Sequence, residues 1–281
     1  MQIITTIAEL REQLKQWRQA GDTIGLVPTM GNLHAGHLQL VTTAQEQVKR
    51  VVVSVFVNPM QFCEGEDFDC YPRTGHEDAA KLQTANVDIM FKPSTKEIYP
   101  QKPLTTVTVA EISEDYCGAS RLGHFDGVAN VVCKLFNIVQ ADKAFFGEKD
   151  FQQLAIIRTM VADLSIATDI IAVNIVREAD GLAMSSRNGY LNDEQRLQAP
   201  FLYKILHWAK DELLLRALSF KEIEAQACTL LALHHLEVEY FSICRQADLQ
   251  AAEENDTNLI ILAAIVLGST RLLDNIQVTL N

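Results

Sequence analysis

Short apolar runs alternate with amphipathic segments along the N-terminal part of the chain. Residues 7–20 place large apolar side chains at helical spacing, which predicts an amphipathic helix. Residues 51–57 are almost all apolar, as expected of a strand covered on both faces, and residues 105–109 have the composition of an additional edge strand. Other strand-like runs occur at 23–27, 87–91, 143–146 and 170–176. Strands alternating with helices predict βαβ units around a mostly parallel sheet.

The pattern changes after residue 187, where helical periodicity comes first and strand-like runs follow. Helical stretches are expected at 193–217 and 219–235, and strands at 236–244, 258–267 and 271–278. Helices followed by strands are typical of an α+β arrangement. Residues 177–188 lack periodicity, so the boundary between the two domains is expected there. We therefore expect an α/β domain of residues 1–177, followed by a smaller α+β domain of residues 178–281.

Composition limits the class of partner. The 281 residues carry a net charge of −12 at pH 7, which opposes nonspecific binding to nucleic acid or to anionic membranes but permits a local basic pocket. The longest apolar run, residues 259–268, is well short of the ~20 residues that a membrane span needs. Charged residues near the N-terminus argue against a signal peptide. We expect a cytoplasmic protein with neither nucleic acid nor a membrane as its partner.

The most distinctive segment follows the predicted strand at 23–27. It has the sequence PTMGNLHAGH, and it predicts a glycine-containing loop that enters a helix whose first turn carries two histidines. Residues three apart share one helix face, so His34 and His37 can point the same way. The N-terminus of a helix also offers unpaired N–H groups and the positive end of the dipole, which suit phosphate. Two surface histidines decorating a helix are the alternative. The glycine between them and the strand before them favour binding of a nucleotide triphosphate.

Three further polar segments also follow predicted strands. They are residues 58–62, 147–150 and, after a short loop, 184–188. Ligands of open parallel sheets bind beyond the carboxyl ends of the strands, in the loops that lead to the helices. We therefore expect these segments to converge with residues 30–37 on one rim of the sheet.

Several side chains in these segments have chemistry suited to a nucleotide or a small polar substrate. Lys149 and Arg187 are cations, and the hydroxyls beside Arg187 suit phosphate, although exposed lysines are common on any surface. Gln61 and Gln153 offer neutral donors and acceptors, and ordinary surface glutamines are an equally good interpretation. His124 lies in a segment, residues 111–127, that the glycines mark as a mobile loop, and the sequence assigns it no role.

Together these segments resemble the pantothenate synthetases, or pantoate–β-alanine ligases, of the H-x-G-H nucleotidylyltransferase superfamily. The resemblance covers residues 1–190 and extends more loosely to the end. Residues 184–188 resemble the family's counterpart of the second superfamily motif. H-x-G-H alone is shared with other adenylyltransferases and with class I tRNA synthetases, so the accompanying blocks carry the specificity. Those blocks are VNPMQF at 57–62, YPR at 71–73, GHF at 123–125 and FGEKDFQQ at 146–153.

The resemblance implies a Rossmann-like domain that binds ATP and pantoate, and a two-step ligase reaction. The carboxylate of (R)-pantoate attacks the α-phosphate of ATP and releases diphosphate. The amine of β-alanine then displaces AMP from the pantoyl adenylate. The resemblance also implies Mg²⁺ with the triphosphate and a homodimer.

Carried over position by position, the resemblance assigns roles to individual residues. His37 is the catalytic donor with His34 as its neighbour, and Lys149 and Arg187 complete the catalytic set. Asp150 would hold the ribose. The expected ATP-binding residues are Met30, Gly31, Asn32, Leu33, His34, Ala35, Gly36, His37, Gly147, Glu148, Lys149, Asp150, Val176, Met184, Ser185, Ser186 and Arg187.

The same resemblance places pantoate on Gln61 and Gln153, and β-alanine near Gln61. Residues 111–127 would help to exclude water from the adenylate. Three alternatives remain: another H-x-G-H adenylyltransferase acting on a phosphorylated substrate, a tRNA synthetase fragment, and a catalytically inactive nucleotide-binding protein. The neutral glutamines argue against the first alternative, the charge of −12 against the second, and the intact histidines and cations against the third.

Overall fold

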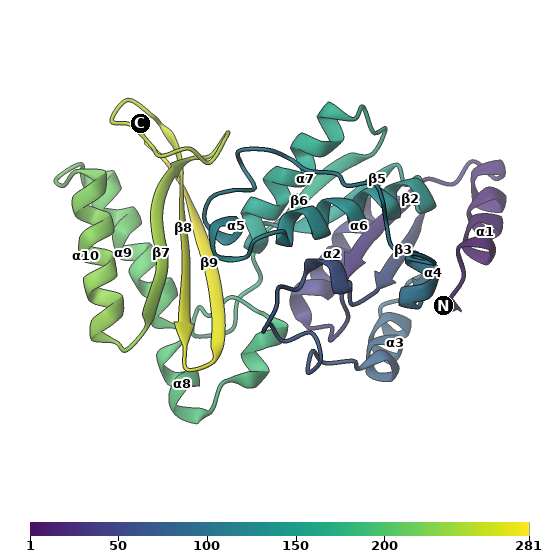
Figure 1. The fold of residues 1–281 in the computed structure, drawn as a ribbon, viewed down its shortest axis with the longest axis horizontal. Helices are drawn as coiled ribbons and strands as arrows, with labels where there is room; N and C mark the ends of the chain where they lie inside the picture. Colours follow the sequence, from purple (N-terminus) through teal and green to yellow (C-terminus); the bar gives the residue numbers. More distant parts are fainter. Residues whose placement is uncertain (281) are drawn as a thin grey trace. The chain divides into compact units, whose positions relative to one another are not determined.

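The computed structural model describes residues 1–280 (Figure 1). The chain divides into two compact units. The first consists of Met1–Glu148 and Gln153–Asn174, and the second of Lys149–Gln152 and Ile175–Asn281. The fold is α/β with a smaller α+β part at the C-terminus, as the sequence pattern predicts.

The first unit is built on a six-stranded parallel sheet with the order β1-β4-β3-β2-β5-β6. The five predicted strands of this sheet are confirmed. The sequence pattern missed β1, because it has three residues at the sheet edge and buries only Ile4. The strands are β1 Gln2–Ile4, β2 Ile24–Thr29, β3 Arg50–Val55, β4 Ile89–Phe91, β5 Lys143–Gly147 and β6 Asp169–Val173.

Helices and short 3₁₀ turns connect these strands. The predicted N-terminal helix is α1, which buries Leu10, Leu14 and Trp17 and packs against α6. Helix α2 packs against β2, β3 and β5. The helical elements are α1 Ile7–Gln19, α2 Ala35–Gln47, η1 Pro59–Gln61, α3 Gly75–Thr84, α4 Thr95–Ile98, α5 Cys117–Ser120, α6 His124–Val139, η2 Glu148–Asp150 and α7 Phe151–Asp163.

The expected strand at 105–109 is wrong, because no strand forms there. The side chain of Asn130 on α6 pairs with the backbone of Val107 instead. Its Oδ1 accepts from the Val107 N–H at 3.2 Å, and its Nδ2 donates to the Val107 carbonyl at 3.5 Å. One amide side chain therefore satisfies the backbone groups that a neighbouring strand would otherwise pair.

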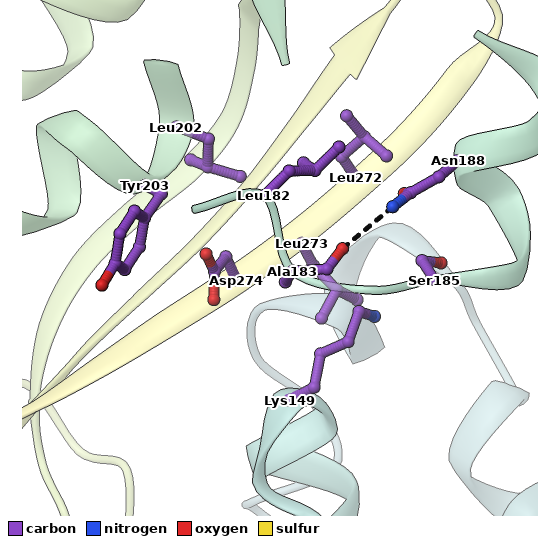
Figure 2. A pocket seen from close by; sticks show the side chains of 10 residues that line it. All are labelled: Lys149, Leu182, Ala183, Ser185, Asn188, Leu202, Tyr203, Leu272, Leu273 and Asp274. Carbon is purple, nitrogen blue, oxygen red and sulfur yellow. Dashed lines mark hydrogen bonds between the residues drawn. The ribbon is translucent and has the colours of Figure 1, made fainter. Parts of the chain in front are cut away.

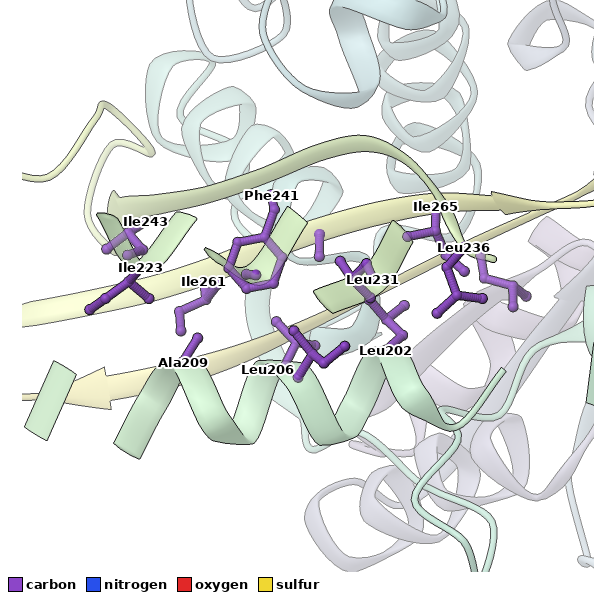
Figure 3. Close-up of a cluster of buried hydrophobic side chains, with 14 of the residues drawn as sticks. Leu202, Leu206, Ala209, Ile223, Leu231, Leu236, Phe241, Ile243, Ile261 and Ile265 are labelled. Carbon is purple, nitrogen blue, oxygen red and sulfur yellow. The ribbon is translucent and has the colours of Figure 1, made fainter. Parts of the chain in front are cut away.

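The second unit joins helices to a three-stranded antiparallel sheet with the order β7-β8-β9. The strands are β7 Glu237–Arg245, β8 Asn258–Leu267 and β9 Thr270–Thr279, which confirms the three predicted runs. Apolar side chains of α9 and α10 face those of the sheet and form the core, among them Leu206, Leu231, Phe241 and Ile261 (Figure 3). The helical elements are η3 Ser186–Tyr190, α8 Asp193–Gln198, α9 Phe201–Leu215 and α10 Phe220–Leu233.

The single helix expected over 193–217 is two helices, α8 and α9. Pro200 separates them, because proline has no N–H to donate to the carbonyl four residues earlier. None of the six cysteines, all within the described residues, forms a disulfide. Among residues 1–280, no helix combines the length and the apolar character needed to cross a membrane.

Candidate active site

The loop between β2 and α2 carries the two histidines of the motif. Gly31 and Asn32 adopt positive φ values of 88° and 50°, which turn the chain sharply after the strand. A Cβ at Gly31 would lie 3.0 Å from Oδ2 of Asp78, so a larger residue would crowd this turn. His34 is the N-cap of α2, so it lies just before the helix and not within its first turn as expected. His37 is the third helical residue.

The two imidazoles lie side by side, with ring centroids 4.1 Å apart. Nδ1 of His34 accepts a hydrogen bond from the Gly36 N–H at 3.1 Å. Nδ1 of His37 accepts one from the His34 N–H at 3.3 Å. A neutral imidazole whose Nδ1 is an acceptor carries its proton on Nε2. The local backbone thus selects the same tautomer in both rings, with Nε2 as the donor.

The buried carboxylate of Asp78, on α3, holds this loop in place. Its Oδ2 accepts from the Asn32 N–H at 3.0 Å and from the Thr74 hydroxyl at 3.2 Å, and its Oδ1 accepts from the Leu33 N–H at 2.8 Å. Lys81, one helical turn further along α3, donates to the Leu33 carbonyl at 2.6 Å. Sequence reasoning missed both residues, because a charge in a polar helix normally indicates a solvent-exposed face.

Gln61 lies in the 3₁₀ turn η1 after β3, and the structure brings its amide to Met30. Gln61 Nε2 lies 3.1 Å from Met30 Sδ, and Gln61 Oε1 accepts from Asn58 Nδ2 at 3.2 Å. Asn58 is itself buried and accepts from the hydroxyl of Tyr99 at 3.0 Å. Burial raises the pKa of Tyr99 to about 12, so this hydroxyl remains a donor at neutral pH. The side chain of Gln61 is therefore oriented by Met30 and by Asn58, the N-cap of its own turn, which Tyr99 holds in place.

The backbone of Gln61 is held by a second set of residues. Nδ1 of His124 lies 2.7 Å from the Gln61 carbonyl, and Nη1 of Arg121 lies 2.8 Å from Nε2 of His124. A carbonyl oxygen accepts and a guanidinium donates, so this geometry suits a His124 ring in which Nδ1 is the donor and Nε2 the acceptor. Arg121 also forms a bidentate pair with Glu66, at 2.5 and 2.7 Å.

The expectation that residues 111–127 form a mobile loop is wrong for two parts of this segment. Residues 117–120 form α5, and His124 is the buried first residue of α6. Gly127 lies within α6, where a Cβ would meet the Met60 carbonyl oxygen at 2.1 Å. Asn58 Nδ2 donates to the Gly127 carbonyl at 3.1 Å, so η1 and α6 are in direct contact. Gly127 therefore allows α6 to lie close to η1 and does not act as a hinge.

The topology of the first unit brings its polar segments to one edge of the sheet. Strands β3, β2 and β5 are neighbours and run parallel, so their carboxyl ends lie together. Residues 30–37 follow β2, residues 58–62 follow β3, and Glu148 follows β5. Gln153 is half-buried on α7, the helix that follows β5.

Gly147 is the last residue of β5 in the first unit, and the second unit contains the expected ATP-binding residues Lys149, Asp150, Val176 and 184–187. Lys149, Ser185 and Asn188 line a pocket of 280 Å³, part of it open to solvent (Figure 2). The other lining residues are Leu182, Ala183, Leu202, Tyr203, Leu272, Leu273 and Asp274. Lys149 extends toward the segment that carries Ala183 and Ser185 (Figure 2). Its Nζ lies 3.6 Å from Oδ1 of Asp150.

Val176 and Met184 are joined across a short loop in this unit. The Met184 N–H donates to the Val176 carbonyl at 3.0 Å, and Arg177 and Ala183 form an antiparallel bridge. Ser185 then caps η3, where its hydroxyl accepts from the Arg187 N–H at 3.3 Å. The structure therefore brings the expected residues at 176 and 184 together and places Ser186 and Arg187 on the turn that follows.

Comparisons with known proteins cover the chain nearly from end to end. The family model described as pantoate-beta-alanine ligase matches residues 2–277. A pantothenate synthetase of Shewanella halifaxensis is 52% identical over 283 residues, covering 99% of this chain and all of that protein. A pantothenate synthetase of Colwellia psychrerythraea is 48% identical over 289 residues and is also fully covered.

Solved structures agree with these sequence relatives. The crystal structure of pantothenate synthetase from Thermus thermophilus has a TM-score of 0.92 and 41% identity, covering 98% of this chain and 99% of that one. The pantoate-beta-alanine ligase of Francisella tularensis, complexed with beta-gamma ATP and beta-alanine, has a TM-score of 0.79 and 32% identity. Its alignment covers 98% of this chain and 97% of that one. The chain belongs to the pantoate–β-alanine ligase family.

Proposed function

We propose that this ligase joins (R)-pantoate to β-alanine through a pantoyl adenylate. The enzyme forms an amide bond at the expense of ATP, as its family does. In the first step a pantoate carboxylate oxygen attacks the α-phosphorus, and the bond to diphosphate breaks. In the second step the amine nitrogen of β-alanine attacks the acyl carbon, AMP leaves with the bridging oxygen, and the nitrogen loses a proton.

The observation that carries this proposal is the pair of backbone hydrogen bonds accepted by Nδ1 of His34 and Nδ1 of His37. Because Nδ1 of His34 and Nδ1 of His37 both accept backbone hydrogen bonds, each ring presents Nε2–H as its donor. We assign these donors to phosphate oxygens, on which negative charge develops as the pentacoordinate phosphorus forms. A preorganised donor of this kind typically contributes roughly 10²- to 10³-fold to turnover.

Positive charge is needed because a carboxylate must approach a polyphosphate. The chain as a whole is acidic, with a net charge of −12. We propose that Lys149 and Arg187 supply the local charge, that Ser185 and Ser186 donate to phosphate oxygens, and that Asp150 binds the ribose. The remaining proposed nucleotide contacts are the segment 30–37, Gly147, Glu148, Val176 and Met184.

We assign pantoate to Gln61 and Gln153, and β-alanine to the vicinity of Gln61. The fixed orientation of the Gln61 amide by Asn58 supports a specific hydrogen bond to a small polar substrate. Neutral amides suit a substrate whose single carboxylate is consumed in the first step. No protein nucleophile is required in this scheme, since the substrate carboxylate performs the attack.

Mg²⁺ is proposed to enter with the nucleotide. Within the described residues, no group of three or more His, Cys, Asp or Glu side chains is arranged to hold a metal ion. The chain therefore fits an ion held mainly by triphosphate oxygens and water, which is the usual mode for Mg²⁺. When bound, the ion neutralises part of the triphosphate charge.

We also propose a cytoplasmic homodimer in which residues 1–177 form the catalytic domain and residues 178–281 a lid. A lid would exclude water, as an acyl adenylate requires. Light scattering coupled to gel filtration measures the oligomeric state directly, and a monomer at micromolar concentration would contradict the dimer.

Product analysis tests the proposed reaction. Purified enzyme is incubated with ATP and Mg²⁺, with or without (R)-pantoate and β-alanine, and AMP, diphosphate and the amide are quantified. We expect equal amounts of AMP and amide only when both substrates are present. Formation of ADP and phosphate instead would exclude the adenylate route.

A further inference from the structure

We propose that Asp274 and Asn275 on β9 are positioning residues for the proposed ATP-binding residues of the second unit. They contact the two segments to which ATP-binding roles are proposed above, the main chain at Lys149 and the loop from Val176 to Met184. The inference rests on the proposed roles of those segments. Asp274 also lines the pocket that Lys149 and Ser185 line, and the role proposed for it is to hold the loop through Arg177.

Asp274 anchors the loop through Arg177. Asp274 is 4% exposed, and its carboxylate accepts from both terminal nitrogens of Arg177, at 2.6 and 2.9 Å. Burial raises the pKa of Asp274, and the hydrogen bonds from Arg177 oppose that shift. Breaking such a buried pair leaves an uncompensated charge, whereas the intact bidentate pair fixes the relative position of the two chains.

The guanidinium of Arg177 also contacts the loop between Val176 and Met184 and the neighbouring helix. It donates to the Gly181 carbonyl at 3.1 Å and lies 4.0 Å above the ring of Tyr203. Gly181 has a φ of +93°, and a Cβ there would lie 2.2 Å from the Tyr203 ring. The loop is therefore packed tightly around Arg177. It leads directly into Ser185, the N-cap of the turn that carries Arg187.

Asn275 contacts the other segment. Its Nδ2 donates to the Lys149 carbonyl at 3.0 Å, although the two residues are 126 positions apart in the sequence. Asn275 is 3% exposed, and its own N–H donates to Oδ1 of Asp274 at 2.8 Å. Asn275 thus holds the backbone of Lys149, and Asp274, through Arg177, holds the loop that leads to Arg187.

A purely structural role is the competing explanation, because both residues lie in a packed strand. Val278 offers a matched control on the same strand. It is 2% exposed and belongs to the hydrophobic cluster between β9 and the helices. Truncation at Val278 lowers stability without removing a contact to Lys149 or Arg177, so stability loss and mispositioning can be separated.

The test compares Asn275→Asp, Asn275→Ser and Asp274→Asn with Val278→Ala. Diphosphate release gives kcat and the KM values for ATP and pantoate, and circular dichroism melting gives Tm. We expect Asn275→Asp to lower kcat/KM for ATP about tenfold, since small misplacements of reacting groups have effects of this order or more. The KM for pantoate should change less than twofold. Val278→Ala should lower Tm and leave the ratio of the two KM values unchanged.

A double-variant cycle separates this inference from the proposed role of Lys149. If Asn275 acts through Lys149, Asn275→Asp should have little further effect on ATP kinetics in the Lys149→Ala background. Normal ATP kinetics in Asn275→Asp and Asn275→Ser, with Lys149→Ala impaired, would overturn the positioning role alone. Normal kinetics in Lys149→Ala would overturn the role of Lys149 and the inference with it. Equal losses of kcat/KM for ATP and for pantoate in the folded Asn275 variants would also overturn the positioning role.

Discussion

The backbone N–H of His34 donates to Nδ1 of His37 at 3.3 Å, so the motif orients the imidazole that we propose as the catalytic donor. The interaction is half of a capping box, in which the side chain of each histidine accepts from the backbone N–H of the other. Its chemical consequence is that the proton of His37 resides on Nε2. A capping interaction thus determines which ring nitrogen can donate to a phosphate.

Two substitutions at His37 separate the capping function from the donor function. The amide oxygen of asparagine can replace Nδ1 as the acceptor of the His34 N–H, whereas the longer glutamine places an amide N–H near the position of Nε2. We expect His37→Asn to reduce kcat roughly 10²- to 10³-fold, and His37→Gln to retain more activity. Diphosphate release measures both variants, with Tm as the check on folding. Activity of His37→Asn equal to or above that of His37→Gln would refute donation from Nε2.

Asp78 should matter for stability as well as for activity. Asp78→Ala removes the acceptor for the N–H groups of Asn32 and Leu33. Leaving such donors without a partner should reduce the free energy of unfolding by about 2–4 kcal/mol, measured by urea titration. The neighbouring Glu77 is exposed on the same helix turn, so Glu77→Ala serves as the control and should change it by less than about 0.5 kcal/mol. Similar losses of unfolding free energy in the two variants would show that the hydrogen bonds of the buried carboxylate do not stabilise the fold.

The Glu66–Arg121 pair predicts a dependence of stability on pH. Burial alone would raise the pKa of Glu66, but the hydrogen bonds and charge of Arg121 outweigh it, so the pKa is lowered. A carboxyl with a lowered folded-state pKa stabilises the fold above its unfolded pKa of about 4.3. That stabilisation is lost as the pH falls through the folded-state value.

We therefore expect Glu66→Gln to be less stable than the wild type at pH 7 and the difference to shrink below about pH 4. Urea midpoints between pH 3 and pH 7 measure this difference. Glu64 is exposed two residues away, and Glu64→Gln should show almost no such trend. A constant gap between Glu66→Gln and the wild type over the whole range would contradict the assignment.

Gln61 should affect the use of pantoate more than the use of ATP. Gln61→Ala removes the amide that Asn58 orients, and we expect kcat/KM for pantoate to fall at least tenfold, the size expected from one lost hydrogen bond in a closed site. The KM for ATP should change less than threefold. Steady-state kinetics with each substrate varied in turn gives both values. Equal effects on the two substrates would mean that Gln61 does not belong to the pantoate pocket.

Local sequence patterns were sufficient to predict most of the fold. The alternation of apolar runs and helical periodicity located five of the six strands of the parallel sheet and all three of the antiparallel sheet. Glycine and the histidine spacing located the turn between β2 and α2. These features depend on neighbours in the sequence, so a single chain reveals them.

Features that depend on distant residues were not predictable in this way. Asp78 contacts a loop 45 residues away, and Asn275 contacts Lys149 across 126 residues. The backbone of Val107, in the segment predicted as a strand, pairs with the side chain of Asn130 and not with a neighbouring strand. The glycines near His124 suggested a mobile loop, but Gly127 allows α6 to approach η1 closely. Each of these cases requires knowledge of tertiary contacts that periodicity and motif spacing do not contain.

The most direct test of the central claim is isotope exchange between labelled diphosphate and ATP. The enzyme is supplied with Mg²⁺, ATP and (R)-pantoate, and β-alanine is left out. We predict exchange that requires pantoate, because adenylate formation is reversible before the amine arrives, and we predict its near loss in His37→Asn. Exchange that is absent until β-alanine is added would contradict a discrete pantoyl adenylate.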